Sequence, residues 1–120
     1  MSLQIMSFGF KHGLPSDADF VFDMRALPNP YWEKNLRNYS GKDQAVIDFL
    51  SKQDSAKTML ADLIRFFEHW IPQFEKDNRS YLSIALGCTG GHHRSVYMAE
   101  QLAEKRGHQH KQVLIRHRDI

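Results

Sequence analysis

The sequence predicts a single three-layer α/β domain, in which a mostly parallel sheet of about four strands carries helices on both faces. Three observations support this class. Short runs of strand-forming residues alternate with helical patterns along the chain. A nearly continuous apolar run, residues 80–86, ends at a glycine, as buried parallel strands do. The length of 120 residues fits one domain, residues 1–120, that is large enough to bury a core.

Two strands are expected in the first part of the chain. Residues Leu3–Phe10 alternate loosely between apolar and polar side chains, and Phe20–Met24 is rich in residues that favour strands. The segment between them, Lys11–Pro15, contains glycine and proline and predicts a turn or loop.

A proline-rich loop is expected after the second strand. Pro28 and Pro30 exclude a helix over residues 25–32 and predict an extended conformation. Tyr31 and Trp32 are candidates for stacking on RNA, but packing against the domain is the favoured interpretation, because large aromatic side chains usually bury apolar surface.

Two helical patterns follow this loop. A short helix is expected to start near residues 40–43 and to carry Val46, Ile47 and Leu50. The longer pattern covers about Ser55 to Glu75. Pro72 near its end predicts a kink or an early stop. Apolar residues fall on one side of this helix, and we expect them to belong to the core: Leu60, Leu63, Ile64, Phe67, Ile71 and Phe74.

The last third of the chain predicts a strand, a helix and a final strand. The apolar run Ser80–Leu86 is the first strand, and a helix is expected over about His93 to Lys105. Gly107 is placed to end that helix. Gln112–Ile115 is the last strand.

The junction between that strand and helix is the candidate functional centre, with the sequence Gly87-Cys88-Thr89-Gly90-Gly91-His92-His93-Arg94-Ser95. Unpaired N–H groups at a helix N-terminus attract anions, and adjacent glycines let the backbone approach a phosphate closely. Thr89 and Ser95 add hydroxyl donors, and Arg94 offers a planar guanidinium suited to phosphate. The alternative is that the glycines only form a tight turn.

The same loop also contains the Cys-x5-Arg-Ser pattern of cysteine phosphatases, formed by Cys88, Arg94 and Ser95. A phosphatase would use Cys88 as the nucleophile and Asp23 as the general acid. Against this, Gly87 stands where those enzymes usually carry histidine, and Cys88 also fits a small buried residue that closes a strand. No Walker A pattern occurs, so ATP hydrolysis is not expected.

Metal binding, disulfides and membrane insertion are not expected. Cys88, His12, His92 and His93 are candidates for a shared site, but their spacing matches no metal motif. A single cysteine excludes an intrachain disulfide and fits a reducing cytoplasm. No apolar run reaches the ~18 residues of a membrane span, and no secretory signal starts the chain. We therefore expect a cytoplasmic protein with no metal and no cofactor.

Basic residues gather near the C-terminus, while the formal charge of the whole chain is only +2. This cluster suits phosphate backbones, although it is equally typical of a solvated surface. No RNP or zinc-finger motif is present, so RNA would be recognised by shape and backbone. The cluster is Lys105, Arg106, His108, His110, Lys111, Arg116, His117 and Arg118.

Three segments carry a family resemblance: GCTGGHHRSVYMAEQLAE, SFGFKHGLPSDADFVFDMRALPNPYW and NRSYL. They resemble the C-terminal domain of the RapZ family of bacterial RNase adapter proteins, also described as nucleotide-binding proteins. The resemblance covers nearly the whole chain. It implies a fold similar to a phosphofructokinase subdomain. It also implies that the domain senses glucosamine-6-phosphate, and that it binds small regulatory RNA and presents it to an endoribonuclease.

The resemblance also implies which residues form the sites. The ligand pocket would comprise Thr89, Gly90, Gly91, His92, His93, Arg94, Ser95, Asp23, Arg79 and Ser80. For RNA the resemblance implies Lys11 and His12, and the basic residues considered on their own add Arg25, Lys111, Arg116 and Arg118. In this interpretation Asp23 hydrogen-bonds a sugar hydroxyl or amine, Arg94 and the loop amides bind the phosphate, and the sugar phosphate competes with RNA.

The sequence departs from the family pattern in three places. The N-terminal kinase-like domain of the family, with its Walker A loop, is absent from these 120 residues. His92 stands where relatives carry lysine in GGKHR, and histidine is a weaker, pH-dependent cation. The basic tail that follows the RHR segment in some relatives is also absent. We thus expect weaker RNA binding but an intact sugar-phosphate pocket, in a domain that can form a homo-oligomer.

Overall fold

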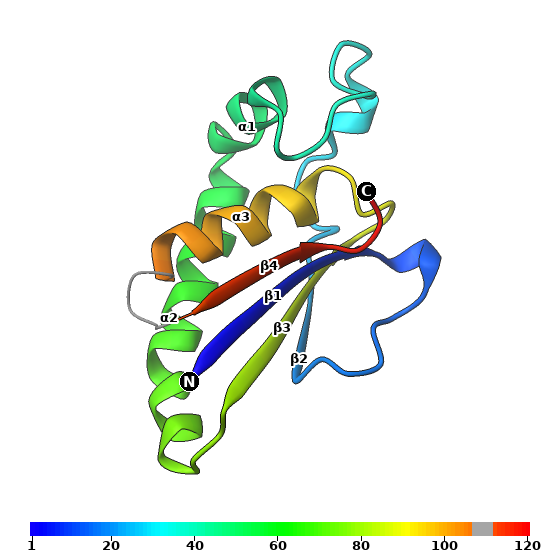
Figure 1. The fold of residues 1–120 in the computed structure, drawn as a ribbon. Helices are drawn as coiled ribbons and strands as arrows, with labels where there is room; N and C mark the ends of the chain where they lie inside the picture. Colours follow the sequence, from blue (N-terminus) through cyan, green and yellow to red (C-terminus); the bar gives the residue numbers. More distant parts are fainter. Residues whose placement is uncertain (107–111) are drawn as a thin grey trace.

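Four parallel strands form one sheet in the computed structural model, which describes residues 1–106 and 112–120 (Figure 1). In chain order the strands are β1 (Ser2–Gly9), β2 (Phe20–Asp23), β3 (Tyr81–Cys88) and β4 (Val113–His117). Their order across the sheet is β2-β3-β1-β4, and every neighbouring pair is parallel. The predicted α/β domain with a four-stranded parallel sheet is confirmed. All four strands end at the same edge, which we call the carboxyl edge.

Three α-helices connect the strands: α1 (Gln44–Ser51), α2 (Asp54–Lys76) and α3 (Arg94–Arg106). All were predicted. Pro72 neither stops α2 nor marks its end, since the helix continues for one more turn to Lys76. Two short 3-10 turns, η1 (Phe10–His12) and η2 (Pro30–Trp32), lie in the loops that follow β1 and β2. None of the described helices is both long and apolar enough to cross a membrane.

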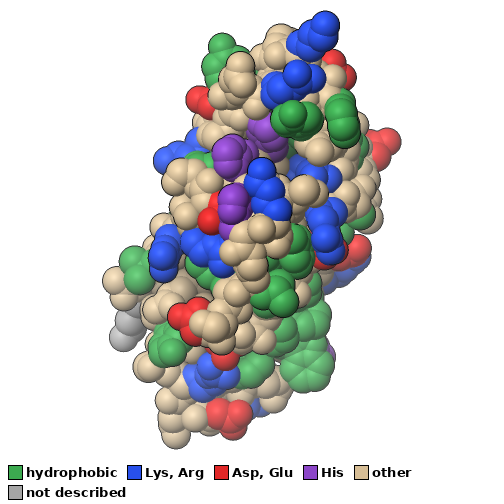
Figure 2. All heavy atoms as spheres, turned by 90° about the vertical axis from the view of Figure 1, so that its right-hand side faces the viewer, with side chains coloured by type: hydrophobic (Ala, Val, Ile, Leu, Met, Phe, Trp, Pro, Cys, Tyr) green, Lys and Arg blue, Asp and Glu red, His purple; other side chains and the backbone are tan. Residues whose placement is uncertain are grey.

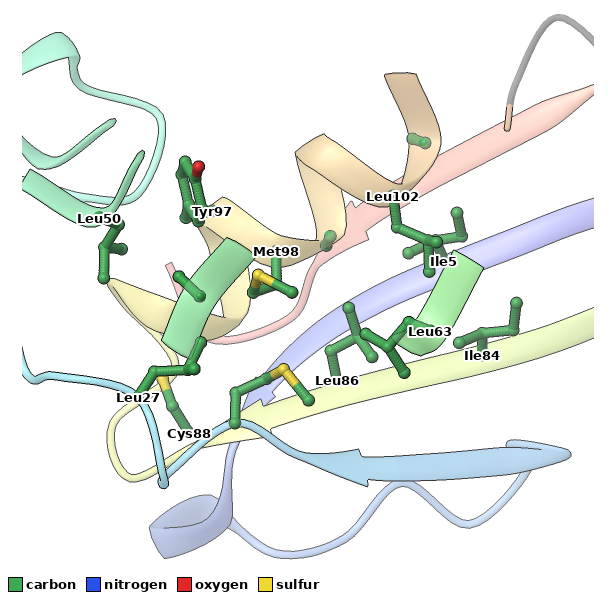
Figure 3. Close-up of a cluster of buried hydrophobic side chains, with 14 of the residues drawn as sticks. Ile5, Leu27, Leu50, Leu63, Ile84, Leu86, Cys88, Tyr97, Met98 and Leu102 are labelled. Carbon is green, nitrogen blue, oxygen red and sulfur yellow. The ribbon is translucent and has the colours of Figure 1, made fainter. Parts of the chain in front are cut away.

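The helices cover one face of the sheet, which corrects the expectation of three layers with helices on both faces. Leu3 lies opposite Leu82 and Ile5 opposite Ile84, so these four side chains point to the same face. That face holds the buried core, which also includes Leu63 of α2 and Met98 and Leu102 of α3 (Figure 3). Phe67 of α2 belongs to the same cluster. The domain therefore has two layers, the sheet and a single layer of helices.

The opposite face is covered only near the carboxyl edge. There Phe8 is buried and packs edge to face with Phe10 over Gly87, where a Cβ atom would collide with both rings. Farther from this edge, Val21 and Tyr81 are exposed on the same face. The apolar run in β3 suggested a layer of helices on each face of the sheet. On this second face, however, the small side chains of the central strand β3 are buried by the neighbouring strands and by Phe8 and Phe10, without a helix.

Candidate anion-binding site

Glycines bring the predicted loop, residues 89–93, into direct contact with the end of β1. A Cβ atom on Gly9 would lie 2.5 Å from the carbonyl carbon of Gly90, and one on Gly91 would lie 2.6 Å from the backbone nitrogen of Gly9. Gly91 also has a φ of 78°, a conformation that costs other residues energy. The paired glycines are thus required by this backbone contact, and they place the loop directly before α3.

Arg94, the first residue of α3, is 5% exposed and has two roles. Its Nη1 donates to the carbonyl oxygens of Arg25 and Leu27, at 2.9 and 3.1 Å, which ties the loop after β2 to α3. Its Nη2 lies 3.5 Å from the Thr89 hydroxyl, and its Nε is buried without a partner among the described residues. Arg94 therefore holds the loop after β2 against α3, and it keeps the other side of its guanidinium toward the glycine loop.

A cleft of about 450 Å³ opens at this point of the carboxyl edge. Its walls carry cationic, histidine and aromatic side chains, and no residue that the structure assigns to its lining is acidic. Figure 2 looks onto this edge and shows histidines and Lys or Arg side chains gathered near its middle. The lining of this anion cleft is Lys11, Asn29, Tyr31, Trp32, Arg37, Cys88, Thr89, Gly90, His92, His93 and Arg94.

Lys11 reaches the cleft from the turn η1. Its backbone N–H donates to the Thr89 carbonyl at 3.2 Å, and its Nζ lies 4.0 Å from where a Cβ on Gly90 would stand. Within residues 1–106 and 112–120, no carboxylate is ion-paired with Lys11. An ammonium group with no ion-pair partner among the described residues therefore stands over the glycine loop, and lysine is a common phosphate ligand.

His92 and His93 differ in exposure. His92 is exposed at the rim, whereas His93 is 7% exposed and its Nε2 has no partner in the described part of the chain. Burial lowers the pKa of His93, and this effect prevails over hydrogen bonding to the backbone of Tyr39 and Arg37, which raises the pKa. His93 is thus mostly uncharged near pH 7, and its Nε2 is buried rather than open to the cleft.

Asp23 is engaged outside the cleft. It forms an ion pair with Arg25 at 2.7 Å, and the Arg25 guanidinium lies 4.0 Å above the centre of the Phe10 ring. Hydrogen bonds from Arg25 hold the pKa of Asp23 below its usual value. A general acid must be protonated to act, so this environment does not favour the acid role in a phosphatase. It also places Arg25, a predicted RNA contact, in an ion pair.

Cys88 and Ser95 belong to the interior. Cys88 is buried in the core, and its thiol donates to the Ser95 hydroxyl at 3.1 Å. Ser95 is fully buried and is absent from the cleft lining, so its predicted contact with a ligand is corrected. The geometry favours the interpretation of Cys88 as a small residue that closes a strand. No group of three or more potential metal ligands occurs in the described residues.

Arg79 and Ser80, which we placed in the ligand pocket, lie at the opposite end of the sheet. They precede β3, whereas the glycine loop follows it, and a strand of eight residues spans about 26 Å. Arg79 forms an ion pair with Asp19 at 2.7 Å, and its guanidinium lies over Phe74. These two residues therefore support the fold near the amino ends of the strands and do not reach the cleft.

The other predicted RNA contacts do not form one site. Arg118 holds the turn after β1, since its Nη2 donates to the Gly13 carbonyl at 2.7 Å while Asp119 accepts from the Gly9 N–H at 2.7 Å. Arg118 and Asp119 also form an ion pair. Arg116 is exposed on the sheet face that lacks helices, opposite Met6. His12 is exposed beside Lys11. Lys111 and Gly107 lie outside the described residues.

The structure adds residues that the sequence analysis did not place in the pocket. Asn29, Tyr31, Trp32 and Arg37 line the cleft, and Trp32 is 74% exposed. The expectation that the aromatic pair packs against the domain is therefore wrong. The available signal was positional: a proline-rich loop follows a strand, and such loops lie at the carboxyl edge of a parallel sheet.

Comparison with known proteins places the chain in a family. The family model described as RapZ C-terminal domain matches residues 1–120. A relative from Nitrosococcus oceani is 55% identical over 120 residues, the whole of this chain and 43% of the relative. A relative from Hahella chejuensis is 50% identical, again over the whole chain, which spans 42% of that protein.

A third relative, from Pseudomonas savastanoi pv. phaseolicola, is 53% identical over 116 residues, or 97% of this chain and 41% of the relative. All three proteins carry the name "Nucleotide-binding protein". The chain spans about two-fifths of the length of these relatives. The match over all 120 residues shows that the chain belongs to the RapZ C-terminal domain family.

Proposed function

We propose that this domain senses a phosphorylated amino sugar such as glucosamine-6-phosphate, and that it binds small regulatory RNA through the same basic edge of the sheet. One observation carries the proposal. The anion cleft combines an unpaired Lys11, the edge of Arg94 and the glycine loop, and no residue assigned to its lining is acidic. The regulatory and nucleotide-binding roles associated with this family are consistent with such a site.

The phosphate would lie against Gly90, between Lys11 and Arg94. The N–H groups of the first turn of α3 carry a partial positive charge, and a phosphate that accepts from them gains charge-assisted hydrogen bonds. The volume of about 450 Å³ lies in the range of pockets for small ligands.

RNA would extend beyond the cleft over the exposed basic residues. Lys11 lines the cleft, His12 is exposed next to it in the chain, and Arg116 stands on the open face of the sheet. An RNA phosphate and a sugar phosphate would both need Lys11, so each would weaken binding of the other. This competition would couple the sugar-phosphate level to presentation of the RNA to an endoribonuclease.

The test is calorimetric titration of glucosamine-6-phosphate into wild type and Lys11→Ala, with free phosphate assayed in the same samples. We expect about 10-fold weaker binding in Lys11→Ala, because a charged hydrogen bond is lost. The matched control is Lys57→Ala, an exposed lysine on α2. Absence of binding to wild type would overturn the sensor proposal. Release of phosphate that depends on Cys88 would instead support the phosphatase.

A further inference from the structure

Two aromatic side chains stand exposed at the rim of the anion cleft. Trp32 is 74% exposed and Tyr31 is 46% exposed, and their rings meet edge to face at 5.4 Å. Exposing an indole and a phenol side by side forfeits the stabilisation that burial of large aromatic rings supplies. Exposed aromatic pairs of this kind are typical of binding surfaces rather than of the fold.

The backbone beneath this pair is held in place by its neighbours. Pro30 is buried, and the Asn29 side chain accepts from the Tyr31 N–H at 3.1 Å. Arg37 donates to the Tyr31 carbonyl at 2.9 Å, and its guanidinium lies 4.7 Å above the centre of the Tyr31 ring. The aromatic pair is thus organised before any ligand arrives, which lowers the entropy cost of binding.

The same cleft supplies charge that suits a nucleic acid. Tyr31 and Trp32 share it with Lys11, Arg37 and Arg94, and its lining as described contains no acidic side chain. Flat aromatic faces beside a cationic groove are the combination by which proteins hold single-stranded nucleic acids, since each base stacks while the backbone follows the charge. A base within a duplex already stacks on its neighbours, so only an unpaired base can use such a face.

We propose that the anion cleft holds an unpaired nucleotide of a single-stranded RNA segment, with its base stacked on Trp32 and its phosphate beside Gly90 and Lys11. The inference rests on the proposed anion site and adds to it the part of the RNA that enters the cleft. RNA recognition by this domain then depends on an unpaired nucleotide, in contrast to the expectation of shape and backbone recognition alone.

The test uses the 120-residue chain and a fluorescent oligoadenylate of about ten nucleotides, a length typical of single-strand binding sites. Trp32→Ala should weaken binding of the single strand about 5- to 100-fold, whereas Trp32→Phe should retain most of the affinity. Both variants should bind the same strand, annealed to its complement, as wild type does. The matched control is Trp70→Ala, since Trp70 is 43% exposed on α2 and does not line the cleft.

Fluorescence gives a second readout that a merely structural role would not change. The chain has two tryptophans, so Trp70→Phe leaves Trp32 as the only source of tryptophan fluorescence. Stacking of adenine should quench that emission as the oligonucleotide is added. Equal loss of single-strand and duplex binding in Trp32→Ala, absence of quenching, or tighter binding of free AMP than of the oligonucleotide would each overturn the inference.

Titration of wild type with glucosamine-6-phosphate, run in parallel, separates this inference from the proposed function. Binding of the sugar phosphate together with Trp32-independent binding of the oligonucleotide overturns the stacking inference and leaves the sensor in place. Trp32-dependent binding of the oligonucleotide without binding of the sugar phosphate supports the stacking inference and overturns the sensor.

Discussion

Two hollows of nearly equal size differ in what surrounds them. The anion cleft, of about 450 Å³, lies at the carboxyl edge and is built mainly from loops. The other, of about 470 Å³, lies between α1, α3 and β4, and we call it the α3–β4 groove. The residues that line this groove include Glu100 and Glu104, with Ile47, Tyr97 and Val113 supplying apolar walls.

The difference indicates that backbone position, rather than volume, makes the cleft the candidate for anion binding. Helix side chains line most of the groove, and the backbone N–H groups within a helix already donate to carbonyls of the same helix. The cleft lies where a strand ends and α3 begins, so N–H groups are free and cations from three loops converge. The following predictions test this contrast, from the largest expected effect to the smallest.

Gly91→Ala should have the largest effect, because it removes the backbone contact that forms the cleft. A Cβ atom there would lie 2.6 Å from Gly9, at a φ of 78°. We expect a loss of about 2–4 kcal/mol in the free energy of unfolding, measured by urea denaturation, together with loss of anion binding. The control is Gly13→Ala, which has a φ of 92° but nothing within 4 Å of the added atom. Equal losses in both variants would contradict the contact argument.

Arg94→Lys should have the next largest effect, because a single ammonium group lacks the planar fork with which Arg94 donates to two carbonyls through Nη1 and faces Thr89 with Nη2. We expect a loss of about 1.5–3 kcal/mol in stability and weaker binding of glucosamine-6-phosphate. Thermal unfolding and calorimetry measure the two effects separately. Arg65→Lys on α2, where the arginine is exposed, is the matched control. Unchanged stability in Arg94→Lys would show that the hydrogen bonds from Arg94 to the carbonyls of Arg25 and Leu27 are not needed for stability.

The stability of the protein should fall in acid because of His93 in the cleft, and in base because of Tyr97 in the groove. Burial lowers the pKa of His93, so the unfolded chain binds its proton more tightly, and this contribution to stability is lost as pH falls from about 6.5. Burial raises the pKa of Tyr97 in the groove, so its contribution is lost as pH rises above about 10.

Unfolding by urea between pH 7 and pH 5 tests the acidic side of this prediction. His93→Gln should reduce the dependence of stability on pH in that range, because glutamine does not titrate. The matched control is His69→Gln, at an exposed position on α2. A pH dependence in His93→Gln identical to that of wild type would rule out His93 as its source.

Glu104→Gln should have the smallest effect, because it changes the groove and leaves the cleft intact. We expect the affinity for glucosamine-6-phosphate to change less than about 2-fold, since exposed charges that are far apart are screened by salt. Calorimetry at physiological ionic strength measures this. A large increase in affinity would indicate that the net charge of the domain, and not the local geometry of the cleft, controls anion binding.

Much of the site followed from local sequence. Gly90, Gly91 and Arg94 lie within five residues of one another, so the strand, the turn and the helix that they join could be recognised together. Lys11 is distant in sequence but follows another strand, and the carboxyl ends of parallel strands meet at one edge. Asn29 and Arg37 carried no local signal, because their position depends on how a loop folds back over α3.

The sequence by itself determined the order of strands and helices, the parallel sheet and the position of the glycine loop, because each depends on patterns within a few consecutive residues. Only the tertiary structure decided that all helices share one face, that Arg79 and Ser80 lie a strand away from the cleft, and that Tyr31 and Trp32 remain exposed. These properties depend on which distant segment covers a given surface. An apolar residue fits a covered and an exposed position equally well until its neighbours are known.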